Sequence, residues 1–185
     1  MDMISEASES ITQGSIVDGV DFCFGEDIPL GIVLSNACDF INDKMGYVLL
    51  ASLVPAKNVI LESKEFKNKM EGVGEDHKLS KNKWSSVKPL LDNYIFNKGV
   101  SRYYFINVEP VLESPPLFVD FQHIVSIPIA QIHELENVAQ LDSPYREQMM
   151  VQFASYTARI PIDRINDTTD LARNLIEPEY TVTNI

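Results

Sequence analysis

The sequence predicts an α+β fold, mainly β, in which one small barrel carries a helical insertion and a C-terminal helix. Three observations predict this class. Short apolar runs separated by polar turns fill the first third of the chain, as expected for β-strands. Residues 56–98 are rich in lysine and glutamate and place their apolar residues at helical spacing. The segment after Ser143-Pro144 carries a single apolar stripe with helical periodicity.

Length and composition are those of one globular domain. The chain has 185 residues, of which 45% are hydrophobic and 23% are charged. No apolar run reaches the length of a membrane span. The first residues are acidic and polar and lack the pattern of a secretory signal, so we expect a cytoplasmic protein that makes no membrane contact. The predicted organisation is a flexible leader over 1–13, a single barrel domain over 14–162 with an insertion at about 56–98, and a peripheral tail over 163–185.

Three neighbouring segments near the start of the domain predict an antiparallel meander. Each is apolar or alternates apolar and polar residues, and polar turns separate them. These segments are residues 15–24, 30–34 and 47–54, the last ended by Pro55. Strand patterns return after the insertion at residues 102–108, 117–121 and 123–127, and a short helical turn is expected over 130–135.

Helix signals are clearest in the insertion and near the C-terminus. Within the insertion, residues 72–74 (GVG) separate two helices, Ser80 caps the second, and Pro89 should kink or split it. An Asn-Lys-Gly sequence over 97–99 ends that helix. Near the C-terminus, Ser143 is the expected cap and Pro144 the first helical residue. The apolar stripe of this last helix, interpreted as core packing, consists of Tyr145, Met149, Phe153, Tyr156 and Ile160.

Charge is distributed unevenly along the chain. The formal net charge is −12, which argues against nucleic-acid binding through attraction by the whole molecule. Between Lys57 and Lys98, nine lysines and six acidic residues give +3, so the rest of the chain carries −15. The preferred interpretation of this stretch is a solvated helical insertion. A basic patch that contacts an acidic protein partner or a nucleic acid is the alternative.

The strand sequences near the N-terminus resemble a known family. Residues 13–17 (QGSIV), 30–36 (LGIVLSN) and 48–54 (VLLASLV) are similar to the first strands of the MazF/PemK-like toxins. In that family a G-D-I-V start precedes a P-V-V-V-L-S-N strand and a V-V-V-A-P-I-T strand. The resemblance covers roughly residues 13–54, with weaker support from residues 118–132. It implies an SH3-like barrel, usually dimeric, whose active members cut RNA without a metal.

The chain departs from this family at the positions that carry its chemistry. The family's catalytic arginine precedes the second strand, where this chain has Asp27-Ile28-Pro29-Leu30. Its catalytic threonine ends the third strand, where this chain has Val54. Metal-free RNA cleavage needs a cation beside the charged transition state and a group that transfers a proton. Arg102 or His123, from other strands, would have to supply these in a rearranged site.

A polar cluster at residues 35–39 is the other candidate site. Cys38 is a candidate nucleophile, with His123 as its base and Asp39 orienting the histidine; Ser35 and Asn36 are candidate binding residues. In the preferred structural interpretation, Asn36 and Asp39 shape a tight turn and Cys38 is a small buried side chain.

Two further constellations are weaker. Cys23, Cys38, Asp39 and His123 would form a metal site only if three separate segments converged, so no metal or other cofactor is expected. Without a short-spaced pair, both cysteines are interpreted as reduced thiols, and His77 and His133 as surface residues. The aromatic residues Trp84, Tyr103 and Tyr104, with Lys81 or Lys83, are candidates for stacking bases beside phosphates, although the strand pattern places one tyrosine in the core.

Three hypotheses follow. The leading one is a non-catalytic MazF/PemK-like module that binds a protein partner in a bacterial or phage conflict system, either as a monomer or as a homodimer. The second is an active metal-independent endoribonuclease with a rearranged site at Arg102 or His123. The third is a cysteine-dependent hydrolase centred on Cys38. The missing arginine and threonine favour the first, non-enzymatic hypothesis.

Overall fold

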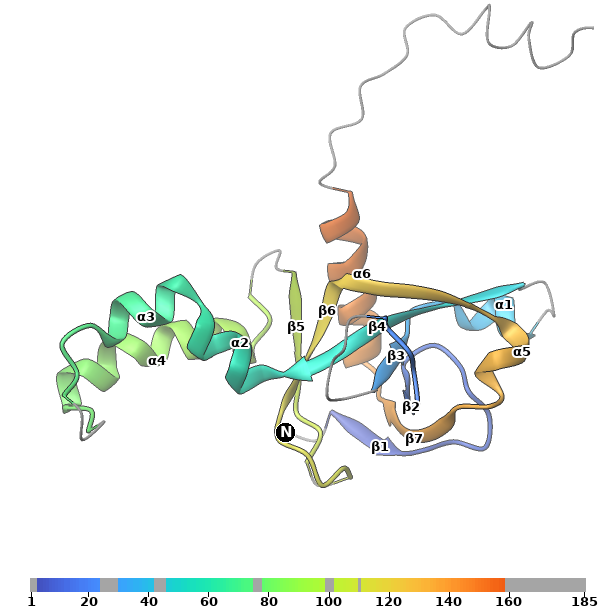
Figure 1. The fold of residues 1–185 in the computed structure, drawn as a ribbon, viewed down its shortest axis with the longest axis horizontal. Coiled ribbons are helices and arrows are strands. Elements are labelled where there is room, and N and C mark those ends of the chain that lie inside the picture. Colours follow the sequence, from blue (N-terminus) through green and yellow to red (C-terminus); the bar gives the residue numbers. More distant parts are fainter. Residues whose placement is uncertain are drawn as a thin grey trace, which may run out of the picture.

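A computed structural model describes residues 3–23, 30–41, 46–74, 78–98, 102–109 and 111–158. Its body is a seven-stranded antiparallel sheet with the order β1-β7-β2-β3-β4-β6-β5 (Figure 1). The strands are β1 (Ile4–Glu6), β2 (Ser15–Asp18), β3 (Gly31–Val33), β4 (Tyr47–Pro55), β5 (Tyr103–Ile106), β6 (Leu117–Pro128) and β7 (Glu136–Leu141).

The sheet curls so that its two ends approach each other. Met3, just before β1, is almost fully buried, and its Sδ accepts a hydrogen bond of 3.4 Å from the backbone N–H of Asn107, just after β5. β1 and β5 are the outermost strands in the sheet order. The predicted α+β class, mainly β, is therefore confirmed as an antiparallel half-barrel with added helices.

The expected meander at the start of the domain is also confirmed. β2, β3 and β4 are neighbours in the sheet, and Ile32 of β3 lies between Ile16 of β2 and Ala51 of β4 in the pairing register. All three of these side chains are fully buried. Because side chains alternate between the faces of a strand, this register places the apolar residues of three strands on one inner surface.

An aromatic cluster packs around Phe118 of β6. The Phe118 ring is fully buried, and its centroid lies 5.5 Å from that of Tyr94, 5.4 Å from Tyr103 and 5.9 Å from Phe105. Burying one such side chain contributes roughly 1.5–3 kcal/mol, and tilted or edge-on aromatic pairs add to that. This aromatic cluster joins the helical insertion to the sheet, because Tyr94 belongs to the insertion.

The helical insertion forms an arm that projects from the sheet (Figure 1). We call residues 56–98 the helical arm; its helices are α2 (Ala56–Glu62), α3 (Lys64–Met70) and α4 (Lys81–Ile95). Ser80 caps α4 as predicted, because its side chain accepts a hydrogen bond from the N–H of Lys83. The expected split at Pro89 is wrong: α4 continues through it as one 15-residue helix. Proline has no backbone N–H to donate to the carbonyl one turn earlier, and because Pro89 is exposed, water can hydrate that carbonyl instead.

The C-terminal helix, α6 (Tyr145–Thr157), packs against the sheet as predicted. Met149 is fully buried, and the Phe121 ring of β6 lies 5.4 Å from Phe153 and 6.1 Å from Tyr156. The expected start of this helix is wrong. Pro144 occupies the cap position itself, without a side-chain cap, so Ser143 lies outside the helix. Ile160, the last residue of the predicted stripe, lies outside the described residues, as does the expected tail over 163–185.

Two strands were not predicted. The expected flexible leader over 1–13 instead contains β1, which pairs with β7, so that Ile4 lies opposite Leu141. Each of these strands is short, and β7 (ENVAQL) is largely polar, so neither carries a strong strand pattern of its own. β1 pairs with β7, and β7 also pairs with β2. This pairing stabilises two strands whose own sequences do not predict a strand.

Two short helices complete the described part of the chain. They are α1 (Ala37–Ile41) and α5 (Ile129–Ile132), the second close to the predicted turn over 130–135. Within the described residues, no helix combines the length and the apolar character needed to cross a membrane.

Candidate functional site

A bulge in β6 creates the most unusual polar cluster of the sheet. The two strands expected at 117–121 and 123–127 are one continuous strand, paired with β4. Ser52 of β4 pairs with Asp120, whereas its neighbour Ala51 pairs with Ile124, so residues 121–123 are inserted between two consecutive pairs. Bulges re-aim side chains and occur often beside active sites.

The carboxylate of Asp120 is the centre of this cluster. Its side chain is only 2% exposed, and its Oδ1 accepts a hydrogen bond of 2.6 Å from Nε of Arg102. A terminal guanidinium nitrogen of Arg102 donates to Oδ2, so the ion pair is bidentate. The backbone N–H of Gln122 donates to Oδ1 at 3.0 Å, and Nδ1 of His123 lies 3.3 Å from Oδ2. We call Arg102, Asp120 and His123 the Asp120 cluster.

Arg102 is charged but its charge is balanced. Its hydrogen bond to Asp120 is the largest cause of a raised pKa, so the guanidinium stays protonated at any physiological pH. The guanidinium also lies over the ring of Tyr103, 4.8 Å from the centroid. The positive charge of Arg102 is therefore paired with the carboxylate of Asp120, and one face of the guanidinium is covered by the Tyr103 ring.

Arg102 and His123 are candidate residues from the sequence, whereas Asp120, the residue that joins them, is not. Both side chains are about one third exposed, and they approach Asp120 from β5 and from the bulge. The available signal was a single aspartate within the apolar run LFVDF over 117–121. A lone charge on a buried strand requires a partner, because burying an unpaired carboxylate is very costly.

Residues 35–39 lead from the end of β3 into α1, so Cys38 and Asp39 belong to the first turn of that helix. Oγ of Ser35 accepts a hydrogen bond of 2.8 Å from the N–H of Leu49, and Oδ1 of Asn36 accepts one of 3.3 Å from the N–H of Cys38. The turn interpretation is therefore confirmed for Asn36, but Cys38 is exposed and is not the buried side chain expected. The carboxylate that faces His123 is Asp120 of the same strand, in place of the Asp39 that the cysteine hypothesis requires.

The other predicted constellations are not assembled. Within the ranges that the structure describes, no three His, Cys, Asp or Glu side chains are grouped closely enough to hold a metal ion. The alternative site of Cys23, Cys38, Asp39 and His123 is thus not formed, and Cys23 is an exposed thiol like Cys38. His133 is exposed, in agreement with its expected surface position, and His77 lies outside the described residues.

Two positions correspond to the catalytic residues of the MazF/PemK-like toxins, and only one of them lies in the described part of the chain. Val54 lies in β4 opposite Phe118 and packs against the core. Residues 27–29, the expected place of the arginine, lie outside the described part of the chain.

The base-stacking constellation is separated by the fold. Tyr104 is buried, and its hydroxyl donates to the carbonyl of Tyr145 at 3.0 Å, so its ring cannot stack on a ligand. Burial also raises its pKa. Trp84 is 47% exposed in the first turn of α4, and this helix begins at the end of the arm away from the sheet (Figure 1). Lys81 is exposed on the same turn, while Nζ of Lys83 donates to the carbonyl of Glu71 at 2.7 Å.

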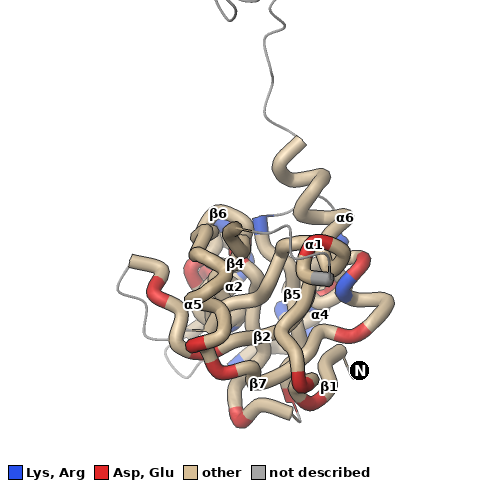
Figure 2. Tube along the Cα trace, turned by 90° about the vertical axis from the view of Figure 1, so that its right-hand side faces the viewer, with Lys and Arg blue, Asp and Glu red and all other residues tan. Residues whose placement is uncertain are grey.

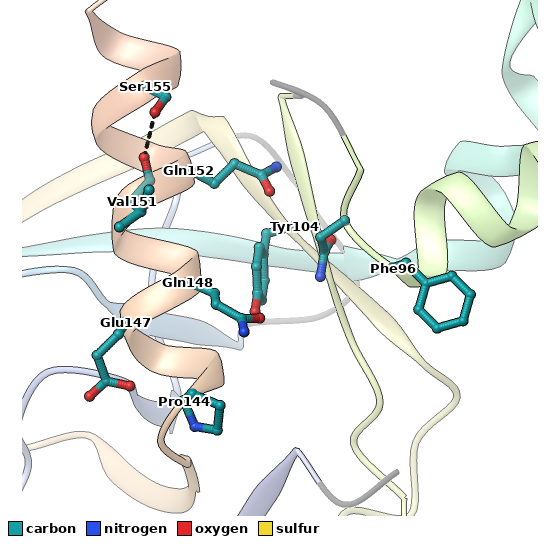
Figure 3. A pocket seen from close by; sticks show the side chains of 9 residues that line it. Phe96, Tyr104, Pro144, Glu147, Gln148, Val151, Gln152 and Ser155 are labelled. Carbon is teal, nitrogen blue, oxygen red and sulfur yellow. Dashed lines mark hydrogen bonds between the residues drawn. The ribbon is translucent and has the colours of Figure 1, made fainter.

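A groove of about 600 Å³ lies between α6 and the outer edge of β5 (Figure 3). Side chains cap the edge of the strand within it. Oδ1 of Asn97 accepts a 2.6 Å hydrogen bond from the N–H of Phe105, and its Nδ2 donates to the Phe105 carbonyl at 3.1 Å. Nε2 of Gln152, from α6, donates to the carbonyl of Tyr103 at 2.9 Å. This edge is therefore blocked against pairing with another strand.

Acidic residues are spread over the body of the protein. Figure 2 views the body from the side opposite the arm and shows acidic positions on the segments around β7, α5 and α1. Exposed examples are Glu134 and Glu136 near β7 and Asp39 in α1. The excess of lysine between Lys57 and Lys98 lies on the arm, so the two parts of the molecule differ in charge as well as in structure.

The fold and the cluster define a class of protein: an antiparallel half-barrel with a helical arm and an Arg-Asp-His cluster. No protein-family model and no curated protein matches the chain. Among solved structures it is similar to a chain of the MazE–MazF crystal structure from Deinococcus radiodurans, with 12% sequence identity and a TM-score of 0.41. The match covers 82% of this chain and 99% of that chain. A likeness this loose carries no argument about family, activity or partners.

Proposed function

We propose that the chain is a non-catalytic MazF/PemK-like binding module that holds a protein partner in a bacterial or phage conflict system, of the toxin–antitoxin or anti-phage kind. The observation that carries the binding role is the surface of the helical arm. Of the seven large hydrophobic side chains exposed in the described residues, five belong to the arm: Leu61, Leu79, Trp84, Ile95 and Phe96. Two of them, Leu79 and Trp84, lie close together in the sequence at the start of α4, and exposed apolar surface of this kind marks interaction sites.

The strands at residues 13–54 support the MazF/PemK-like part of this proposal. Their sequences resemble the opening strands of that family, and the corresponding segments are neighbours in one curled sheet. The conflict setting rests on that resemblance alone.

The Asp120 cluster supports the non-catalytic part of the proposal. Cleavage of RNA without a metal requires a cation that is available to a phosphate. The carboxylate of Asp120 already accepts hydrogen bonds from Nε and from one terminal nitrogen of Arg102. A phosphate would have to compete with this buried, bidentate carboxylate for the guanidinium. Val54, in the place of the family's threonine, cannot transfer a proton.

The tip of the arm is the proposed partner surface. Trp84 and Leu79 are exposed there beside Lys81, which combines a large aromatic anchor with positive charge. Tryptophan is enriched among the residues that dominate binding energies at protein interfaces. An acidic protein surface with an apolar pocket is the complementary partner.

Affinity capture from the native cell tests this proposal. Tagged wild-type chain is compared with Trp84→Ala and with the matched control Tyr47→Ala, which removes an exposed aromatic residue from β4, outside the arm. We expect one protein partner to be retained by the wild type and the control and lost with Trp84→Ala. Recovery of only further copies of this chain, or equal capture by both variants, counts against the proposal.

A ribonuclease with a rearranged site is the second candidate function. One observation favours it: Arg102 and His123, from different strands, converge on the same carboxylate, and an aspartate beside Nδ1 is the arrangement that orients a catalytic histidine. Mixed RNA is incubated with the wild type, Arg102→Ala and His123→Ala in the presence of a chelator at several pH values. Cleavage that both substitutions abolish supports this candidate, and no cleavage by the wild type discards it.

A further inference from the structure

A second apolar surface lies at the base of the arm, separate from its tip. A groove of about 400 Å³ is formed there by the arm, by Phe105 of β5 and by the Pro115-Pro116 turn. We call it the arm-base groove. Leu61 and Ile95, which line it, are 44% and 37% exposed. The groove has the size of a binding pocket for a few apolar side chains, and apolar side chains in such number are seldom left uncovered by water-soluble proteins.

The surroundings of this groove carry both signs of charge, with lysine in excess over the exposed Glu62 of α2 and Glu65 of α3. Lys57 belongs to its lining, and Lys64 and Lys67 are exposed on α3, the helix that contributes Phe66 to the same lining. The whole arm has a formal charge of +3 between Lys57 and Lys98. A segment that fits this groove therefore has apolar side chains on one face and acidic side chains around them.

The chain itself contains such a segment after α6. The sequence over residues 167–177 is DTTDLARNLIE, in which the apolar side chains at positions 171, 172, 175 and 176 share one face of a helix. Thr168 is a suitable cap, and Pro178 a suitable end. Over residues 163–179, five acidic and two basic residues give −3, opposite in sign to the arm.

The connecting chain is long enough to reach. The described chain ends at Ala158, and Leu171 follows 13 residues later. Thirteen extended residues span up to about 43 Å. A domain of this size has a radius of gyration of roughly 15 Å, so the segment can reach either side of the body.

We propose that residues 167–177 form an acidic amphipathic helix that occupies the arm-base groove of the same molecule, with Leu171 and Leu175 placed against Leu61 and Ile95. This inference goes beyond the proposed function, because it concerns the base of the arm and an intramolecular partner. The docked segment would hold the arm against the sheet and cover its lower apolar surface, and leave Trp84 at the tip accessible.

A competition experiment on the full chain tests this. The variant Leu175→Asp/Ile176→Asp puts charges on the apolar face and should release the segment from the groove. The matched control Asn166→Asp/Asn174→Asp adds the same two charges away from the apolar face, one just before the segment and one within it. A fluorescent peptide of residues 163–179 is then titrated onto each protein, and its anisotropy is measured.

The expected result is that the peptide binds the Leu175→Asp/Ile176→Asp protein at least about ten-fold more tightly than the wild type or the control, whose own segments fill the groove. Adding Leu61→Asp, an exposed lining position, to that variant should remove the binding. Hydrogen exchange of α2 and α4 should become faster in Leu175→Asp/Ile176→Asp and stay unchanged in the control.

Three results would overturn the proposal. They are equal peptide binding by the wild type and Leu175→Asp/Ile176→Asp, binding that does not depend on Leu61, and absence of peptide binding to every protein. Protection of α2 and α4 that disappears when the wild type is diluted would instead assign the groove to a second copy of the chain.

Discussion

The sheet and the helical arm differ in how they treat their apolar side chains. In the sheet, β2 and β3 bury nearly every residue, and Phe118 of β6 lies at the centre of an aromatic cluster. In the arm, α3 buries no side chain, and α4 buries only Val87 and Leu90 of its 15 residues. We infer from this difference that the sheet is the stable scaffold, whereas the arm exposes apolar side chains to a binding partner. Substitutions should therefore affect stability in the sheet and binding in the arm.

The largest effect on stability is expected at Phe118. Replacing it by alanine removes a fully buried ring and three aromatic contacts, which should cost about 3–5 kcal/mol of unfolding free energy. Urea unfolding followed by circular dichroism measures this. Val151→Ala on α6, 67% exposed, is the control and should change the value by less than about 0.5 kcal/mol. A small loss at Phe118 would show that the sheet is not the scaffold.

The second effect is expected at the buried ion pair. Asp120→Ala leaves Arg102 without its bidentate partner and should cost about 2 kcal/mol, less than for a fully buried pair because the Arg102 side chain is 32% exposed. The double variant with Arg102→Ala should lose less than the sum of the two single variants. Strict additivity in the same urea experiment would mean that the pair contributes nothing to the fold.

We expect the folded protein to lose stability at high pH because of the buried hydroxyl of Tyr104. Burial raises its pKa above the usual value of 10.0, so the hydroxyl stays neutral in the folded protein while the unfolded chain ionises. This contribution is complete below pH 10 and is lost above it, by about 1.4 kcal/mol per pH unit. Tyr104→Phe should flatten the pH dependence of the unfolding free energy between about pH 10 and 11.5. An unchanged slope in that variant would contradict the buried position of this hydroxyl.

The edge of β5 should show a smaller effect. Asn97→Gly removes the two side-chain hydrogen bonds to Phe105 while tolerating the positive φ of 50° at this position, and should cost about 1.5 kcal/mol. Asn97→Asp retains an acceptor for the Phe105 N–H and should cost about half as much. Hydrogen exchange at Phe105 distinguishes the variants, since the glycine variant alone leaves that N–H uncovered. Equal exchange in both would remove Asn97 from this role.

The sequence predicted the parts of the fold whose signals are local. The three strands of the meander, the cap at Ser80 and the apolar stripe of α6 each depend on residues close together in the chain, and each was recognised. β1 and β7 depend on pairing between residues far apart in the chain, such as Ile4 and Leu141, and a short polar strand such as ENVAQL carries no periodic signal. Both were therefore missed.

The candidate site was predicted in pieces for the same reason. Arg102 and His123 were recognised by residue type, but the bulge that turns His123 towards Asp120 arises from the register between β4 and β6. That register is a tertiary property. The exposed position of Cys38, which removes it from the core, likewise depends on how α1 lies on the body and not on the polar cluster itself.

The affinity of the captured partner for arm variants tests the central contrast most directly. Calorimetric titration compares the wild type, Trp84→Ala and Tyr47→Ala, two exposed aromatic positions on the arm and on the sheet. We expect Trp84→Ala to weaken binding by about 30-fold, as for a dominant interface residue, and to change the free energy of unfolding by less than about 0.5 kcal/mol. Unchanged affinity for Trp84→Ala together with weakened affinity for Tyr47→Ala would contradict this expectation, because the sheet and not the arm would then be the binding surface.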